Sequence, residues 1–241
     1  MSTVKTNTIL PDDPTQDITL GASGDTVSVA ADSIDTNTVK DKGGNILWSS
    51  DGAGNLSNQA AAIGSSNLKL LDTNTVSNQA ASAFTSNIDS TYDTYIIEFI
   101  NINPATNGTS FTFQVSTDGG SSYGKSIQST LTQSYNLGGS QAIQYQAGDD
   151  QVSGTTYVNL TSPNLGNESD RGGSGQFYIF KPSSSTTSIF CGAQTSWFGD
   201  DAASEFFMAA MVIGTVGPVD AINFKMASGN LSGIFKLYGL L

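Results

Sequence analysis

Histidine is absent from this chain of 241 residues, and cysteine and arginine occur once each, as Cys191 and Arg171. Without histidine, the Ser-His-Asp and Cys-His arrangements of hydrolases, histidine-ligated zinc and the usual pH switch are excluded. The lone Cys191 forms no disulfide within the chain, and its apolar neighbours indicate a buried small side chain rather than a nucleophile. A single arginine excludes a site in which several arginines of one chain clamp a carboxylate or a phosphate.

Charge is also scarce. Only 12% of the residues are charged, and most of these are acidic, which gives a formal net charge of -12. Nucleic acids and anionic membranes require a basic face, so we expect neither as a partner. No apolar run approaches the roughly 18 residues of a membrane span. Because residues 1–5 lead into no apolar signal core, we expect synthesis in a reducing cytoplasm.

The chain is rich instead in Ser, Thr, Asn, Gln and Gly, arranged in short repeated strings. Thr-Asn-Thr followed by Val or Ile occurs at 6–9, 36–39 and 73–76. β-Branched residues separated by Gly-rich turns predict short strands, and the uneven spacing excludes a regular solenoid. These strands have too few apolar residues to bury a core in one chain, so we expect three chains around a common axis. The expected strands lie at 18–20, 26–29, 34–39, 46–48 and 68–71.

From about residue 84 the apolar content rises and the expected strands lengthen. Strand candidates lie at 95–102, 111–115, 142–146, 155–160, 175–180, 187–193, 206–213, 221–226 and 233–238. Their number, their spacing and the Gly, Asn and Ser turns between them are typical of a β-sandwich of jelly-roll type. We therefore predict an all-β chain with an N-terminal arm at residues 1–17, a trimeric β shaft at 18–82 and a jelly-roll-like head at 83–241.

The string from Ser116 to Tyr123 matches the Asp-box pattern of sialidase propellers, Ser-x-Asp-x-Gly-x-Ser/Thr-aromatic. A propeller requires several copies of this pattern, and the chain has one. Sialidases also hold the substrate carboxylate with several arginines. We therefore interpret the string as a hairpin turn stapled by Asp118 and Tyr123.

The segment 197–201 is the best local candidate for ligand contact. An exposed aromatic ring beside acids and amides is the usual way to bind a sugar, because the ring stacks on the apolar face while polar groups bind the hydroxyls. The alternative is structural, with the tryptophan closing the end of the sandwich. Loop 164–175 carries the only arginine, and long loops on rigid sandwiches tend to carry recognition. The candidate ligand-binding residues are Trp197, Phe198, Asp200, Asp201, Arg171 and Tyr123.

Neighbouring acids open two further alternatives. The pairs Asp149–Asp150 and Asp200–Asp201, the latter with Glu205 nearby, could serve a glycosidase or bind calcium. Adjacent acids usually lie in solvated turns, however, and no twelve-residue calcium loop is present. We predict no enzymatic activity, no metal and no cofactor.

Three stretches of the chain resemble the fibre proteins of tailed bacteriophages, meaning tail fibres and head fibres. Residues 18–27 are similar to the opening of many fibre shafts. Residues 92–99 followed by 111–123 resemble the first strands of the distal β-sandwich, and 233–240 resemble its end. The resemblance implies a homotrimer in the virion, made in the host cytoplasm, docked on tail or capsid proteins by its N-terminal arm and attached to a host surface component, often a polysaccharide.

Three alternatives to adsorption stay open at this point. One is a structural capsid fibre or decoration protein with no specific ligand. Another is a glycan depolymerase with paired acids across a trimer groove. The third is a cellular carbohydrate-binding module, which we expect to be a monomer.

Overall fold

A computed structural model of the chain describes residues 38–40, 45–50, 56–57, 67–214 and 217–240. Every regular element in these residues is a β-strand, and the strands pair antiparallel. Among them there is no helix that is long and apolar enough to cross a membrane. The chain divides into two compact units, residues 1–64 and 65–241.

The described part of the first unit is a small antiparallel sheet. Its order is β1 (Thr38–Lys40), β2 (Ile46–Ser50) and β3 (Leu56–Ser57). Val39 pairs with Trp48 in the β1–β2 register. The structure thus contains the strand expected at 46–48 and the end of the one expected at 34–39. The arm predicted at 1–17 and the strands predicted at 18–20 and 26–29 lie outside the described residues.

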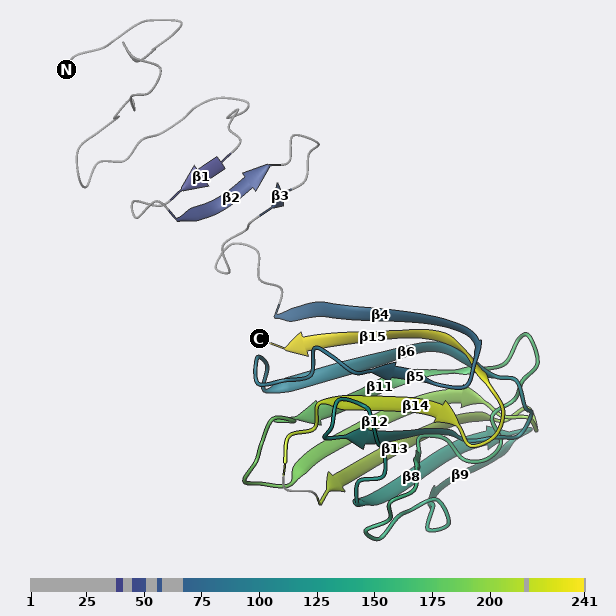
Figure 1. The fold of residues 1–241 in the computed structure, drawn as a ribbon. Helices are drawn as coiled ribbons and strands as arrows, with labels where there is room; N and C mark the ends of the chain where they lie inside the picture. The colour runs from purple at the N-terminus through teal and green to yellow at the C-terminus, as the bar shows by residue number, and fades with distance from the viewer. Residues whose placement is uncertain (1–37, 41–44, 51–55, 58–66, 215–216, 241) are drawn as a thin grey trace, which may run out of the picture. The chain divides into compact units, whose positions relative to one another are not determined.

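The second unit contains two sheets that lie face to face (Figure 1). The larger sheet has the order β4 (Leu68–Gln79), β15 (Leu231–Leu240), β6 (Thr94–Pro104), β11 (Gly173–Phe180), β12 (Ile189–Phe198), β13 (Ser204–Ile213), β8 (Ile127–Leu137) and β9 (Ser140–Tyr145). The smaller sheet has the order β10 (Val158–Asn159), β7 (Phe111–Ser116), β14 (Ala221–Met226) and β5 (Ser82–Phe84). The predicted all-β fold is confirmed, whereas the jelly-roll topology and the trimeric shaft stay predictions.

Period-two alternation of side chains explains most of these strands. In β13, Phe207, Ala209 and Met211 point into the sandwich, while Phe206 and Met208, which alternate with them, are exposed. The run of apolar residues at 206–211 is therefore a strand with one solvent-facing side rather than a strand buried on both sides. Cys191 is buried on the inner side of β12, as expected, and this burial raises the pKa of its thiol.

The core between the sheets centres on aromatic rings. Phe224 of β14 lies within 6.5 Å, between ring centroids, of five other rings. Those five are Phe99, Phe111, Phe113, Phe177 and Phe235, which come from β6, β7, β11 and β15. The smaller sheet therefore packs on one half of the larger one, against β15, β6 and β11.

The predicted boundary between shaft and head at residue 82 needs correction. β4 pairs with β15 along most of its length, and Leu71 and Val76 pack against the core. The third Thr-Asn-Thr repeat, at 73–76, is thus part of the sandwich sheet. The local sequence pattern around the repeat does not indicate that its strand pairs with the last strand of the chain. The repeat was therefore expected in the shaft.

We predict that Gly175→Ala destabilises the sandwich. A Cβ at Gly175 of β11 would lie 2.0 Å from the carbonyl oxygen of Gln194 and 2.8 Å from the Phe99 ring. Backbone on the neighbouring strand has little room to move, so we expect the free energy of unfolding, measured by chemical denaturation, to fall by about 1–3 kcal/mol or more. Gly148→Ala is the control, since a Cβ there meets no atom within 4 Å. Equal stability of the two variants would contradict the close approach at Gly175.

Candidate groove at the strand ends

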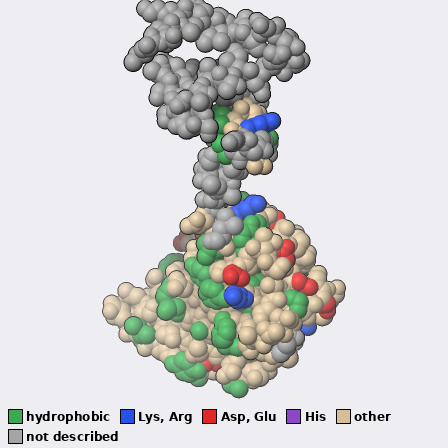
Figure 2. All heavy atoms as spheres, turned by 90° about the vertical axis from the view of Figure 1, so that its left-hand side faces the viewer, with side chains coloured by type: hydrophobic (Ala, Val, Ile, Leu, Met, Phe, Trp, Pro, Cys, Tyr) green, Lys and Arg blue, Asp and Glu red, His purple; other side chains and the backbone are tan. Residues whose placement is uncertain are grey.

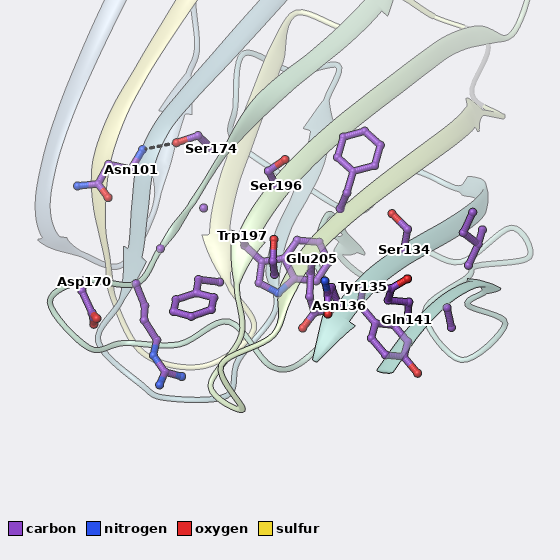
Figure 3. A pocket seen from close by; sticks show the side chains of 18 of the residues that line it. Asn101, Ser134, Tyr135, Asn136, Gln141, Asp170, Ser174, Ser196, Trp197 and Glu205 are labelled. Atoms are coloured by element: carbon purple, nitrogen blue, oxygen red, sulfur yellow. Dashed lines mark hydrogen bonds between the residues drawn. The ribbon is translucent and has the colours of Figure 1, made fainter. Parts of the chain in front are cut away.

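An open groove of about 1130 Å³ runs along one end of the larger sheet. Its floor is a row of outward-facing side chains, Ser174, Ser196, Phe206 and Ser134, which are neighbours in the register of β11, β12, β13 and β8. The Ser174 hydroxyl accepts a hydrogen bond of 2.9 Å from the backbone N–H of Asn101. Figure 3 shows Ser174, Ser196 and Ser134 spread between Asn101 and Asp170 on one side and Gln141 on the other.

The lining is mostly uncharged and rich in hydrogen-bonding groups. Its polar side chains without charge are Asn101, Ser134, Tyr135, Asn136, Gln141, Ser169, Ser174 and Ser196. Phe206 is the exposed aromatic ring among the lining residues, with 37% of its surface accessible. Hydroxyl and amide groups around one accessible ring form the kind of surface that binds a polar ligand with an apolar face.

The structure brings three of the sequence candidates together and separates the others. Arg171, Trp197 and Phe198 line the groove. Asp201 lines a neighbouring hollow of about 620 Å³, and Asp200 lines neither.

Tyr123 lines neither hollow. A Cβ added at Gly120 would lie 2.8 Å from its hydroxyl oxygen, so Tyr123 belongs to the turn after β7. The six candidate residues therefore do not line one hollow, because Asp200, Asp201 and Tyr123 lie in turns and loops outside the groove.

Trp197 is buried rather than exposed, with 4% of its surface accessible. Its Nε1–H donates to Oδ1 of Asn164 at 3.0 Å, and its ring packs edge-on against Phe207 with centroids 5.7 Å apart. Trp197 thus closes the end of the sandwich, which is the structural alternative. Its ring is not a platform for stacking, and the accessible ring belongs to Phe206, whose place in an apolar run gave no sign of exposure.

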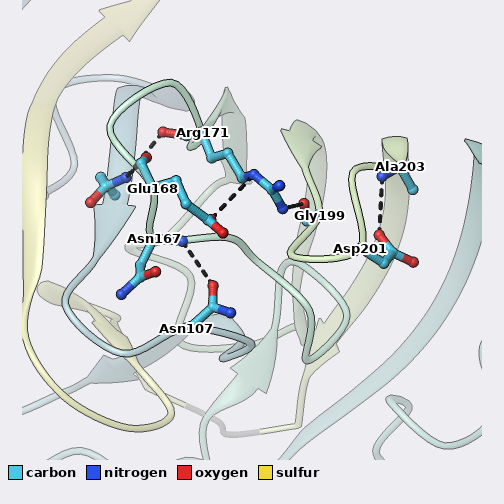
Figure 4. A network of polar contacts seen from close by, with 8 residues as sticks. Asn107, Asn167, Glu168, Arg171, Gly199, Asp201 and Ala203 are labelled. Atoms are coloured by element: carbon cyan, nitrogen blue, oxygen red, sulfur yellow. Dashed lines mark hydrogen bonds and ion pairs between the residues drawn. The ribbon is translucent and has the colours of Figure 1, made fainter.

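Arg171 fixes the loop that precedes β11. Its Nη1 donates to the carbonyl oxygen of Gly199 at 2.5 Å, and its Nε lies 3.2 Å from Oε2 of Glu168. The guanidinium also lies over the Phe198 ring, 5.2 Å from the centroid. Figure 4 shows the contacts of Arg171 with Gly199 and Glu168, together with the bond from the backbone N–H of Asn167 to Asn107. Loop 164–175 is therefore held against the turn after β12.

Glu205 is a buried acid behind the groove. Its two carboxyl oxygens accept hydrogen bonds from the side-chain amides of Asn164 and Gln133, and Gln133 in turn accepts one from Gln144 at 3.1 Å. Removal from water raises the pKa of Glu205 above its ordinary value of 4.5, and the nearby Asp201 acts in the same direction. The two amide donors act in the opposite direction.

The Asp118 turn has the hydrogen bonds that its sequence pattern predicts. Asp118 accepts bonds from the hydroxyl of Ser116 at 2.6 Å and from the backbone N–H of Ser122 at 2.9 Å, and both lower the pKa of its carboxyl. The turn is not a hairpin, however. It joins β7 of the smaller sheet to β8 of the larger sheet, so it is a connection between the two layers.

The described residues contain no group of three or more acidic, cysteine or histidine side chains that could hold a metal ion. Fold and groove define the class of protein: an antiparallel β-sandwich unit, preceded in the chain by a second small sheet, with an open and mostly uncharged groove at its strand ends. No known family model matches the chain, and neither does any curated protein or solved structure. The groove is therefore the feature of the molecule that bears on function.

We predict that Glu205→Gln changes how stability depends on pH. An acid whose pKa is raised by folding binds its proton more tightly in the folded state, so its ionisation disfavours folding. The free energy of unfolding of the wild type, relative to Glu205→Gln, should therefore fall as the pH rises from about 4.5 through the raised pKa, and then level off. Chemical denaturation at a series of pH values measures this difference.

The control for this measurement is Glu168→Gln, which removes one carboxylate from an exposed residue. For each variant, the free energy of unfolding is subtracted from that of the wild type at every pH. If this difference depends on pH in the same way for Glu205→Gln and Glu168→Gln, the raised pKa of Glu205 is contradicted.

Proposed function

We propose that this chain is a virion fibre protein of a bacteriophage and that it mediates adsorption to a glycan on the host surface. The groove is the observation that supports this proposal most directly. In it, neutral hydroxyl and amide groups lie around the accessible ring of Phe206. Sugars bind to such surfaces because their C–H faces stack on an aromatic ring while their hydroxyls exchange hydrogen bonds with the rim. The resemblance to phage fibres agrees with an all-β chain.

The charges favour a neutral glycan. The guanidinium of Arg171 is already engaged by Gly199 and Glu168, so the groove offers no free arginine to an acidic sugar. Asp170 on the groove wall adds negative charge, as does the whole chain at -12. An anionic polysaccharide would meet repulsion both at the groove and at long range.

The proposed protein is a homotrimer that docks on tail or capsid proteins through its N-terminal arm. Three weak sugar sites on one rigid particle raise the overall avidity through effective concentration, without strong binding at any single site. The proposal includes no catalysis. Both carboxyl oxygens of Glu205 are occupied by amide donors, which suits a structural acid better than a proton donor.

A structural role on the capsid, with no specific ligand, is the second candidate. One observation favours it: Trp197, Arg171 and Asn164 make their polar contacts within the chain. On this alternative the groove is only the end of a sheet, and the protein would contribute to the particle through its contacts with other virion proteins.

We predict that Phe206→Ala weakens glycan binding. At roughly 25 cal/mol per Å², the accessible part of this ring contributes about 1–2 kcal/mol, so affinity should fall about 5- to 30-fold. The full chain is first applied to an array of purified neutral and acidic envelope polysaccharides, and the best neutral responder is then titrated by calorimetry. Tyr145→Ala is the matched control, since Tyr145 is an exposed aromatic of the same sheet that does not line the groove.

The possible outcomes separate the two candidates. Binding that falls for Phe206→Ala and stays unchanged for Tyr145→Ala supports the groove as the receptor site. No binding of the wild type to any polysaccharide would overturn adsorption to a glycan and favour the structural role. Equal loss in both variants would place the binding elsewhere.

A further inference from the structure

The outer face of the larger sheet carries a second surface, at the ends of the strands opposite the groove. Here we define the apolar patch by nine side chains on six neighbouring strands, β4, β15, β6, β11, β12 and β13. The nine residues are Leu70, Tyr238, Leu240, Ile96, Tyr178, Phe180, Phe190, Met208 and Val212. The register makes the surface continuous, because Leu70 pairs with Tyr238, Tyr238 with Ile96 and Ile96 with Tyr178.

The patch is large for a protein that stays alone in water. Phe190 exposes 56% of its surface, Leu70 51% and Met208 47%. With roughly 200 Å² for each large side chain, the five exposed residues of the patch expose about 470 Å², and the four half-buried ones bring the total to about 550–750 Å². The largest apolar patch on a typical monomer is about 300–600 Å², whereas a standard protein interface buries about 800 Å² on each partner.

Charge is balanced beside the patch. The neighbouring row across the strands contains Lys236 of β15 and Glu98 of β6, which are paired in the register, followed by Gln176 of β11. Gln176 donates to Glu98 at 3.3 Å and accepts a bond from the Tyr178 hydroxyl at 2.6 Å. This polar row lies between the apolar patch and the groove on β15, β6 and β11, whereas on β13 Met208 of the patch and Phe206 of the groove are neighbours on the same face. Figure 2 shows one side of the molecule, on which hydrophobic side chains gather in patches with few charges among them.

The patch also contains a hollow. Gly192 and Ala210, paired between β12 and β13, leave a depression of about 360 Å³ that is bordered by Tyr178 and Met208. Phe190, two residues before Gly192 on the same strand, projects from the same face. A surface that carries both a projecting ring and a hollow for a ring lets the ring of one copy enter the hollow of the next, which is the head-to-tail contact that a ring of three chains requires.

We infer that the apolar patch is the face on which a second copy of this chain packs. Copies that each carry a net charge of -12 repel one another, and they approach most easily through a face whose few charges cancel. The patch has that property, and its area approaches what a stable interface needs. The inference adds a contact face to the proposed homotrimer and rests on the proposed function to that extent only.

Light scattering after size-exclusion chromatography tests this inference on the full chain over a concentration series. The wild type should have a mass of at least twice 25.0 kDa. Phe190→Asp places a charge on the most exposed side chain of the patch and should return the mass to that of a single chain. Leu70→Asp, on the edge strand β4, should do the same and serves as the second variant if Phe190→Asp fails to fold. Circular dichroism and thermal unfolding check the fold of each.

Val152→Asp is the matched control. Val152 is more exposed than Phe190, at 85%, but lies in the loop between β9 and β10, outside the patch. Its mass should equal that of the wild type. A wild type of 25.0 kDa at every concentration would overturn the inference, as would folded Phe190→Asp and Leu70→Asp variants that keep the wild-type mass. Glycan binding is measured separately, so a failure of self-association leaves the groove proposal standing, and the converse holds as well.

Discussion

The aromatic cluster around Phe224 is the contact on which the sandwich depends. It joins β14 and β7 of the smaller sheet to β6, β11 and β15 of the larger one. Because the smaller sheet has four strands and the larger has eight, it can cover only part of the larger sheet's inner face. The position of the cluster therefore decides which strands are covered by a sheet and which need another cover.

On the half of the larger sheet that the smaller sheet does not cover, loops pack over the inner face of β12, β13 and β8. Gln151 bonds to Ser129, and Asn164 bonds to both Trp197 and Glu205. A loop carries unpaired backbone and amide groups, so the strands beneath it need polar side chains as partners. Glu205 and Gln133 supply these partners on the inner face, where a sheet-covered strand would carry apolar residues. The buried acid is thus a consequence of the unequal width of the two sheets.

Local alternation predicts the central strands well and the connections between distant strands poorly. β6, β7 and β14 were all expected, because their inner positions are large and apolar. β8 was not expected, because its inner positions include Ser129 and Gln133, which pack under a loop. β4 was assigned to a shaft because its pairing with β15 joins residues more than 150 positions apart. The hydrogen bonds of the Asp118 turn could be predicted from its sequence pattern. The connection that this turn makes between two different sheets could not.

The groove was only partly predictable, for the same physical reason. In β13 the acid Glu205 points inward and the ring of Phe206 points to solvent, the reverse of what their hydrophobicity suggests. The register of the strand is set by Phe207, Ala209 and Met211, whose burial forces Glu205 inward and Phe206 and Met208 outward. Exposing large apolar side chains to water costs free energy, and this cost is tolerated where the exposed side of the strand has a function. Phe206 lies in the groove and Met208 in the apolar patch, so one strand contributes an exposed apolar side chain to each proposed surface.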